Sequence, residues 1–182
     1  RGRVALVTGA GRGIGRAVAE RLARDGAVVV INDVDADVAR EVTDGILAAD
    51  GRATCAPGSV VSTEVAAAIV DLVRANHGRL DVLINNAGVT RAAMVHRMTD
   101  EDWNFVLDVS LRGTFNMCRA AASLLRGPGP RSDGRNRKVV NVSSINGIYG
   151  TVANANYSAA KAGVIGLTRA LAREWAPSGV NV

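Results

Sequence analysis

The sequence has 182 residues, of which 48% are hydrophobic and 21% charged, and its mean hydropathy is +0.13. This composition is typical of a folded globular domain and excludes a disordered or repetitive protein. No apolar run approaches the roughly 18 residues of a membrane span, and no signal-peptide pattern opens the chain. We therefore expect one cytoplasmic domain over residues 1–182, with no membrane partner.

The charge is mildly basic, with 22 Lys and Arg residues against 17 Asp and Glu residues, a net charge of +5. The arginines are scattered, and aromatic residues make up only 3% of the chain, too few for base-stacking platforms. We therefore expect no nucleic-acid partner. One local basic excess comprises Arg126, Arg131, Arg135, Arg137 and Lys138. It is either a solvated, exposed loop around 127–136 or a docking patch for an acidic carrier or a phosphate-bearing substrate.

The cysteines and histidines indicate neither a disulfide framework nor a metal site. Cys55 and Cys118 form no CxxC pair, and His77 and His96 have no partners at metal-ligand spacing. We interpret the cysteines as small buried side chains in a reducing compartment. We expect no metal site.

Short apolar runs alternate with segments of helical spacing along the chain. The predicted strands are Val4–Thr8, Val28–Asp33, Ala53–Ala56, Val82–Asn85 and Val139–Ser143. The predicted helices are Ile14–Arg24, Ala36–Ala49, Glu64–Asn76, Glu101–Leu125 and Tyr157–Trp175. Continuous apolar strands are typical of a parallel sheet covered on both faces. The alternation predicts an α/β fold, a doubly wound parallel (Rossmann) sheet in three αβα layers.

Residues typical of helix ends locate the start of one predicted helix and the end of another. Thr99, followed by Asp102, resembles a capping box at the start of the fourth helix. Pro177 and Gly179 end the fifth helix, and residues 180–182 have the pattern of a sixth strand that begins there.

A glycine-rich turn directly follows the first strand. Its glycines are Gly9, Gly11, Gly13 and Gly15, and the next helix begins near Ile14. Glycines permit a tight turn and close approach of the backbone to a pyrophosphate, which the N–H groups and dipole of the helix attract. Strand before and helix after are the context that a dinucleotide site requires, although a turn that merely packs has the same pattern.

Two residues give opposite indications about the dinucleotide. Asp33 ends the second strand, where a carboxylate accepts hydrogen bonds from the ribose hydroxyls. It also repels a 2′-phosphate by roughly 1–4 kcal/mol at about 4 Å. Arg12, within the turn, either attracts that phosphate or is only a solvated turn residue. Because Asp33 is expected against the ribose itself, we predict NAD as the preferred cofactor and NADP as a possible one.

Tyr157 and Lys161 are spaced i, i+4, so that their side chains share one helix face. An ammonium near a phenol favours the phenolate, and such a tyrosine can exchange a proton with a substrate oxygen. Ser144 follows the fifth strand at the sheet edge where ligands bind, and can donate a hydrogen bond to the same oxygen. Ser143 is the rival, and only the offset favours Ser144.

Together these motifs resemble the short-chain dehydrogenase/reductase family. The matching residues are 8–15 (TGAGRGIG), 85–88 (NNAG), Ser144 and 157–161 (YSAAK). The resemblance implies a single Rossmann domain with strand order 3-2-1-4-5-6-7. Tyr157 would be the general acid/base, Lys161 would assist it and hold the nicotinamide ribose, and Ser144 would orient the substrate.

The resemblance also assigns residues outside the catalytic group. Asn86, Ala87 and Gly88 would line the adenosine half of the cofactor site, and Asn85 would tie the fourth strand to its neighbours. The family continues past Val182 with the rest of the sixth strand, a substrate lid and a seventh strand. The chain is therefore expected to be C-terminally incomplete, without that strand and lid.

The sequence departs from the family pattern at two places. Ser110 replaces an asparagine that holds a proton-relaying water in the family, and its shorter side chain puts this relay in doubt. Ser59, followed by Val60, replaces an Asp-Val pair that contacts the adenine, so a hydroxyl stands where the family has a carboxylate.

Two branches of the family share further motifs with the chain. Residues 88–91, 100–103 and 156–161 are similar to 3-oxoacyl-acyl-carrier-protein reductases. Asp33 and residues 59–60, 111–115 and 147–150 are similar to (3R)-hydroxyacyl-CoA dehydrogenases. Both imply hydride transfer at C3 of an acyl thioester of coenzyme A or acyl carrier protein. Asn154 takes the place of a polar substrate-contacting residue.

Alternative functions remain open at this point. Other relatives act on cyclic alcohols, steroids or sugars, and a chain truly lacking the C-terminal part could bind a dinucleotide without catalysis. The predicted helices Glu101–Leu125 and Tyr157–Trp175 correspond to the family's dimer surface, and apolar residues recur around the second. We expect a homo-oligomer, a dimer or a tetramer.

Overall fold

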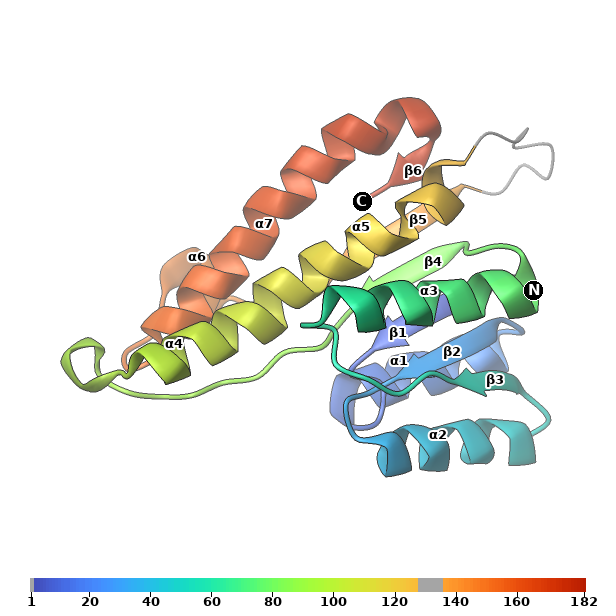
Figure 1. Ribbon diagram of the computed structural model, residues 1–182, viewed down its shortest axis with the longest axis horizontal. Helices are drawn as coiled ribbons and strands as arrows, with labels where there is room; N and C mark the ends of the chain where they lie inside the picture. Colours follow the sequence, from blue (N-terminus) through green and yellow to red (C-terminus); the bar gives the residue numbers. More distant parts are fainter. Residues whose placement is uncertain (1, 128–135) are drawn as a thin grey trace.

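The computed structural model describes residues 2–127 and 136–182 and contains a six-stranded parallel sheet (Figure 1). Its order is β3-β2-β1-β4-β5-β6. The strands are β1 (Val4–Thr8), β2 (Val28–Asn32), β3 (Arg52–Cys55), β4 (Val82–Asn85), β5 (Arg137–Asn141) and β6 (Val180–Asn181). This confirms the predicted doubly wound sheet and its order over the first six strands. All the carboxyl ends lie at one edge of the sheet.

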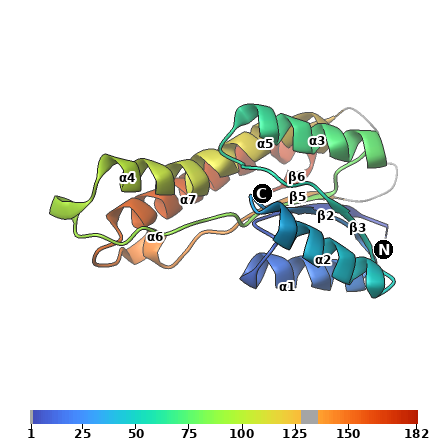
Figure 2. The ribbon, with the colours of Figure 1, turned by 60° about the horizontal axis from the view of Figure 1, so that its bottom comes forward.

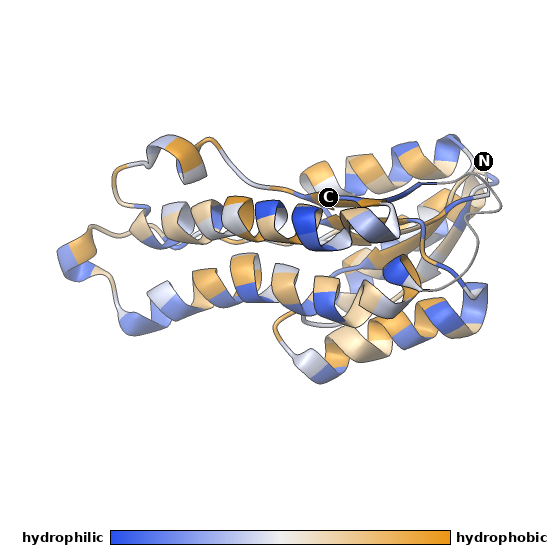
Figure 3. Cartoon of the chain, turned by 90° about the horizontal axis from the view of Figure 1, so that it is seen from above, coloured by the Kyte–Doolittle hydropathy of each residue, from blue (hydrophilic) through white to orange (hydrophobic). Residues whose placement is uncertain are grey.

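Helices cover both faces of the sheet, in the three layers predicted (Figure 2). They are α1 (Gly13–Arg24), α2 (Ala36–Ala48), α3 (Thr63–His77), α4 (Asp100–Leu107), α5 (Gly113–Arg126), α6 (Asn146–Tyr149) and α7 (Ala155–Trp175). Helices α1 and α2 cover one face, and α3, α5 and α7 cover the other. Figure 3 shows hydrophobic and hydrophilic residues alternating along these helices, as expected for elements with one face against the core.

Two hydrophobic cores lie on opposite faces of the sheet. On β1, Leu6 enters the core beneath α3 and α5, and Val7 enters the core beneath α1 and α2. Successive side chains of a strand point to opposite faces, so the continuous apolar run of β1 serves both cores at once. This is why β1 is fully buried and central.

Side-chain caps fix where three helices begin. Asp35 caps α2, Ser62 caps α3, and Thr99 caps α4, each by accepting hydrogen bonds from backbone N–H groups of the first turn. The Thr99 hydroxyl accepts from the N–H of Asp102 at 3.1 Å, which confirms the predicted cap. Such a cap typically contributes about 1 kcal/mol.

The prediction of one uniform helix over Glu101–Leu125 is wrong. A π-helical segment, Asp108–Arg112, separates α4 from α5. An ion pair of 2.7 Å between Arg112 Nε and Asp108 Oδ1 spans this wider turn. Every residue of the segment is compatible with an α-helix, so the periodicity held no sign of the change. The short helix α6 was also absent from the prediction.

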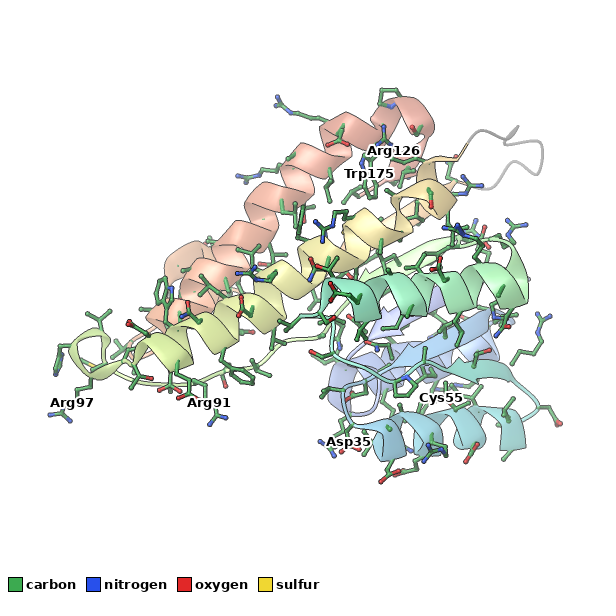
Figure 4. The ribbon with its side chains drawn as sticks, viewed as in Figure 1. Asp35, Cys55, Arg91, Arg97, Arg126 and Trp175 are labelled. Carbon is green, nitrogen blue, oxygen red and sulfur yellow. The ribbon has the colours of Figure 1, made fainter. Side chains whose placement is uncertain are left out.

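The basic excess predicted near 127–136 lies partly outside the described residues, and Arg131 and Arg135 are among those not described. Arg126 pairs with Glu174 at 3.3 Å and lies over the Trp175 ring (Figure 4). Arg137 donates to the Leu125 carbonyl. These two arginines thus contribute to contacts within the fold. Among the described helices, none is long and apolar enough to cross a membrane.

Candidate functional site

Two adjoining cavities open at the carboxyl edge of the sheet. The turn cavity, about 730 Å³, is bounded by the loops that follow β1, β2, β3 and β4. The tyrosine cavity, about 680 Å³, is bounded by α7 and by the segments that follow β4 and β5. Their shared lining residues are Ile14, Asn86, Gly88, Val89 and Phe105. Each has the volume of a typical ligand pocket, and together they form one elongated site.

The turn between β1 and α1 is built on close backbone contacts. Gly9 has a positive φ of 60°, and a Cβ on Gly15 would lie 2.2 Å from the Gly9 carbonyl oxygen. By contrast, a Cβ on Gly13 would meet nothing within 4 Å, because that position faces the open cavity. The glycine pattern therefore folds the turn tightly and leaves the start of α1 accessible to a ligand.

Thr8 and Asn86 clamp the ends of β1 and β4 together. The Thr8 hydroxyl accepts from the N–H groups of Asn86 and Ala87, each at 3.1 Å. The Asn86 side-chain amide donates to the carbonyls of Thr8 and Gly9, each at 3.0 Å. Asn86 thus lines both cavities and also fixes the turn. Asn85 bonds to Asn141 on β5 at 2.8 Å, which confirms its predicted structural role.

Asp33 is fixed across the turn from α1. Its Oδ2 accepts from the Gly11 N–H at 3.0 Å, and its Oδ1 accepts from the Asp35 N–H at 3.2 Å. Asp33 lines the turn cavity together with other residues predicted for the cofactor, which are Gly9, Arg12, Gly13, Ile14, Ser59, Val60, Asn86, Ala87 and Gly88. The structure thus brings these predicted residues together around one cavity. Gly15, also predicted for the cofactor, is not among the described residues that line this cavity, and it packs against the Gly9 carbonyl.

Tyr157 and Lys161 both line the tyrosine cavity from α7. The Lys161 Nζ lies 5.6 Å from the centre of the Tyr157 ring and donates to the Val142 carbonyl at 2.6 Å. Only 4% of Lys161 is exposed. Burial of the ammonium lowers the pKa of Lys161 below its ordinary value.

The structure distinguishes the two serines after β5. Ser143 donates its hydroxyl hydrogen to the Lys161 carbonyl at 2.8 Å, and so joins the strand end to α7. Ser144 accepts a hydrogen bond from the Asn146 N–H at 3.2 Å, a contact that leaves its own hydroxyl hydrogen available. Both serines line the tyrosine cavity. This geometry favours Ser144 as the donor to a ligand.

Ser110, in the π-helical segment, is not among the described residues that line either cavity, but it lies next to Gly88, which lines both. It is completely buried, and its Oγ has no hydrogen-bond partner in the described part of the chain. A Cβ on Gly88 would lie 3.4 Å from Lys161 Nζ and 3.6 Å from Ser110 Oγ, so the two polar groups flank the same point. A buried hydroxyl without a partner is costly, so a water or polar ligand between Ser110 and Lys161 would stabilise this position.

Two asparagines at the start of α7 have different places. Asn154 contacts Val152 and is not among the described residues that line the tyrosine cavity. Asn156, completely buried, donates to the carbonyls of Arg91 and Asp102, and its Oδ1 accepts from the Tyr157 N–H at 2.8 Å. Asn156 therefore fixes the backbone of Tyr157. The sequence analysis missed this role, because its only signal was a polar residue beside the tyrosine.

The family model for short chain dehydrogenases matches residues 3–182. The chain belongs to this family. A crystal structure of a short chain dehydrogenase from Mycobacterium avium superposes with a TM-score of 0.92 at 39% identity, covering 99% of this chain and 65% of that one. The chain thus spans just under two thirds of the length of that dehydrogenase.

Similar sequences within the short-chain dehydrogenases carry two kinds of name. The 3-oxoacyl-[acyl-carrier-protein] reductase of Synechocystis sp. is 41% identical, over 98% of this chain and 70% of that protein. The FabG reductase of Escherichia coli is 38% identical, over 100% of this chain and 70% of that protein. The acetoacetyl-CoA reductase of Shinella zoogloeoides is 43% identical, over 99% of this chain and 70% of that protein.

The buried ammonium of Lys161 makes the free energy of unfolding of this short-chain dehydrogenase change with pH in the alkaline range. Below its lowered pKa, Lys161 is charged in both the folded and unfolded states, and the full cost of burying the charge is present. Above the ordinary pKa of about 10.4 it is neutral in both states, and that cost has vanished. The free energy of unfolding of the wild type, minus that of Lys161→Met, is therefore expected to rise with pH toward 10.4. Urea denaturation at several alkaline pH values measures this difference, and a flat or falling difference would contradict it.

Proposed function

We propose that the protein transfers a hydride between a nicotinamide cofactor and the C3 carbonyl or hydroxyl of an acyl thioester. The observation that carries this proposal is the junction of the turn cavity with the cavity of Tyr157, Lys161 and Ser144. It brings a glycine-rich turn of the kind that binds dinucleotides and a tyrosine suited to proton transfer within one elongated site. The names of the reductases that resemble the chain support a 3-oxoacyl substrate carried by acyl carrier protein or coenzyme A.

The residues of the turn cavity fit a nicotinamide dinucleotide. Backbone N–H groups at the start of α1 would hold the pyrophosphate, Asp33 the adenosine ribose, and Ser59 with Val60 the adenine. Tyr157 and Lys161 would hold the nicotinamide ribose at the other end. The bound cofactor supplies or accepts the hydride. We infer that NAD is preferred over NADP, because the Asp33 carboxylate opposes a 2′-phosphate.

The proton moves through the chain's own side chains. In reduction, the Tyr157 hydroxyl donates its proton to the substrate oxygen while the Ser144 hydroxyl donates a hydrogen bond to the same oxygen. The ammonium of Lys161, close to the tyrosine ring, stabilises the phenolate that is left. Ser110 would take part by holding a water beside Lys161. In oxidation the same groups act in reverse.

The reaction is tested with acetoacetyl-CoA and NADH. We expect turnover by the purified protein, and a loss of about 100-fold or more in kcat for Tyr157→Phe, because a general acid typically contributes 10²–10⁴-fold. Binding of NADH, followed by nicotinamide fluorescence, should weaken by no more than about tenfold in this variant, because it loses one hydrogen bond to the ribose. A protein that reduces a cyclic ketone but not acetoacetyl-CoA would contradict the substrate. One that binds NADH but turns over neither ketone would be a dinucleotide-binding protein without catalysis.

The cofactor preference is tested by separate titrations with NADH and NADPH. We expect NADH to bind at least about fivefold more tightly, since even in water a unit charge at 4 Å is worth about 1 kcal/mol. Nicotinamide fluorescence measures both affinities on the same sample. Equal affinities, or tighter NADPH binding, would refute the preference for NAD.

A second copy of the chain is the proposed partner of the outer face of α5 and α7. A groove of about 360 Å³ lies where the end of α4 and the π-helical segment meet α5 and α7, and its apolar members are Leu107, Leu111, Phe115 and Leu167. Phe115 is 43% exposed there, and an exposed aromatic residue beside an apolar groove favours self-association. We therefore expect a dimer or tetramer in light scattering at micromolar concentration, and a shift toward monomer for Phe115→Ser. A monomeric wild type would refute this.

A further inference from the structure

The sequence placed one cation, Arg12, and one anion, Asp33, at the ribose end of the turn cavity. The structure adds a second anion. Asp35 lies at the N-terminal end of α2, beside the end of β2 (Figure 4), and its Oδ2 pairs with Arg12 Nη2 at 2.9 Å. Arg12 and Asp33 are among the described residues that line the cavity, and Asp35 is not. The guanidinium of Arg12 is thus paired with a carboxylate that lies outside the cavity lining.

Asp35 is a rigid partner because the fold uses both of its carboxylate oxygens. Oδ1 caps α2 by accepting from the N–H groups of Asp37 and Val38, while Oδ2 binds the guanidinium. The backbone N–H of Asp35 donates to Asp33 Oδ1. The short segment from Asp33 to Asp35 therefore positions both carboxylates: that of Asp33 lines the cavity, and that of Asp35 binds Arg12. The Arg12 side chain is 71% exposed, so this ion pair is its main contact with the fold.

The neighbouring cations are also paired. Arg16 bonds to Glu20 at 2.8 Å and Glu41 at 3.0 Å, and Arg40 bonds to Asp37 at 2.9 Å. Around Arg12, the carboxylates of Asp33 and Asp35 outnumber the guanidinium. A phosphate on the ribose 2′-oxygen would meet a net negative charge there, even though an arginine is present.

We propose that Asp35 is a specificity-determining residue for the cofactor, which restrains Arg12 and so keeps it from binding a 2′-phosphate. This inference rests on the proposed nicotinamide cofactor and deepens it. Discrimination then depends on two carboxylates with separate roles. Asp33 selects the ribose directly, and Asp35 neutralises the only guanidinium among the described residues that line the turn cavity.

Asp35→Asn is the informative variant, because asparagine caps a helix as well as aspartate does and removes only the charge. With Arg12 released, we expect the Kd for NADPH to fall by about two- to fivefold, as is usual for exposed charges. The Kd for NADH should change by less than twofold. Both are measured by nicotinamide fluorescence titration. Because the phosphate contact is exposed, the gain should shrink as salt is raised.

Two further variants make the experiment decisive. In the double variant Arg12→Gln, Asp35→Asn, the Kd for NADPH should be the same as in Arg12→Gln alone, so that the gain seen in Asp35→Asn disappears. A gain that persists without the arginine would overturn the proposal, since Asp35 would then act only by its own repulsion. Asp37→Asn is the matched control, because it breaks the Arg40 pair in the same first turn of α2 and should leave both affinities unchanged.

Failure of this inference is distinguishable from failure of the proposed function. A wild type that binds neither cofactor would refute the function itself. A wild type that binds NADH, with NADPH affinity unchanged in Asp35→Asn, would overturn only the role of Asp35. Thermal unfolding of each variant within a few degrees of the wild type shows that the cap is preserved.

Discussion

The hydrogen bonds between Thr8 and Asn86 hold the candidate site together. They join the ends of the two central strands, β1 and β4, at the point where the chain leaves the sheet toward α1 on one side and α4 on the other. Both cavities have Asn86 in their walls. These bonds fix the glycine-rich turn after β1 against the segment that runs from β4 to α4. The hydrophobic cores place the strands, but these polar contacts set the position of the loops relative to one another.

The parts of the site that the sequence predicted are those whose chemistry is local. The glycines of the first turn, Asp33 at a strand end, and the i, i+4 pair of Tyr157 and Lys161 each act through spacing along one element. The fold was predictable for a similar reason, because apolar runs buried on both faces have few other arrangements. Periodicity placed the helices and strands to within a few residues of their observed bounds, apart from the interrupted helix and α6.

The rest depends on contacts between segments far apart in the sequence. Asn156 is ordinary as a sequence feature, and its role appears only when the carbonyls of Arg91 and Asp102 are seen to converge on it. The Asp35 carboxylate has the pattern of a simple helix cap until Arg12 is found against its other oxygen. Ser143 and Ser144 are neighbours with the same hydroxyl, and only the carbonyl of Lys161 distinguishes them. Spacing alone carries no information about such pairings.

The π-helical segment Asp108–Arg112 has a consequence for how this region can change in evolution. An α-helix turns by about 100° per residue, so removing one residue here would rotate everything before it relative to α5. Phe105 would leave the junction of the cavities, although no residue that contacts a ligand had been replaced. Substitutions within the segment alter only a side chain, whereas a deletion redirects a whole helix. The number of residues in this turn is therefore constrained independently of their identity.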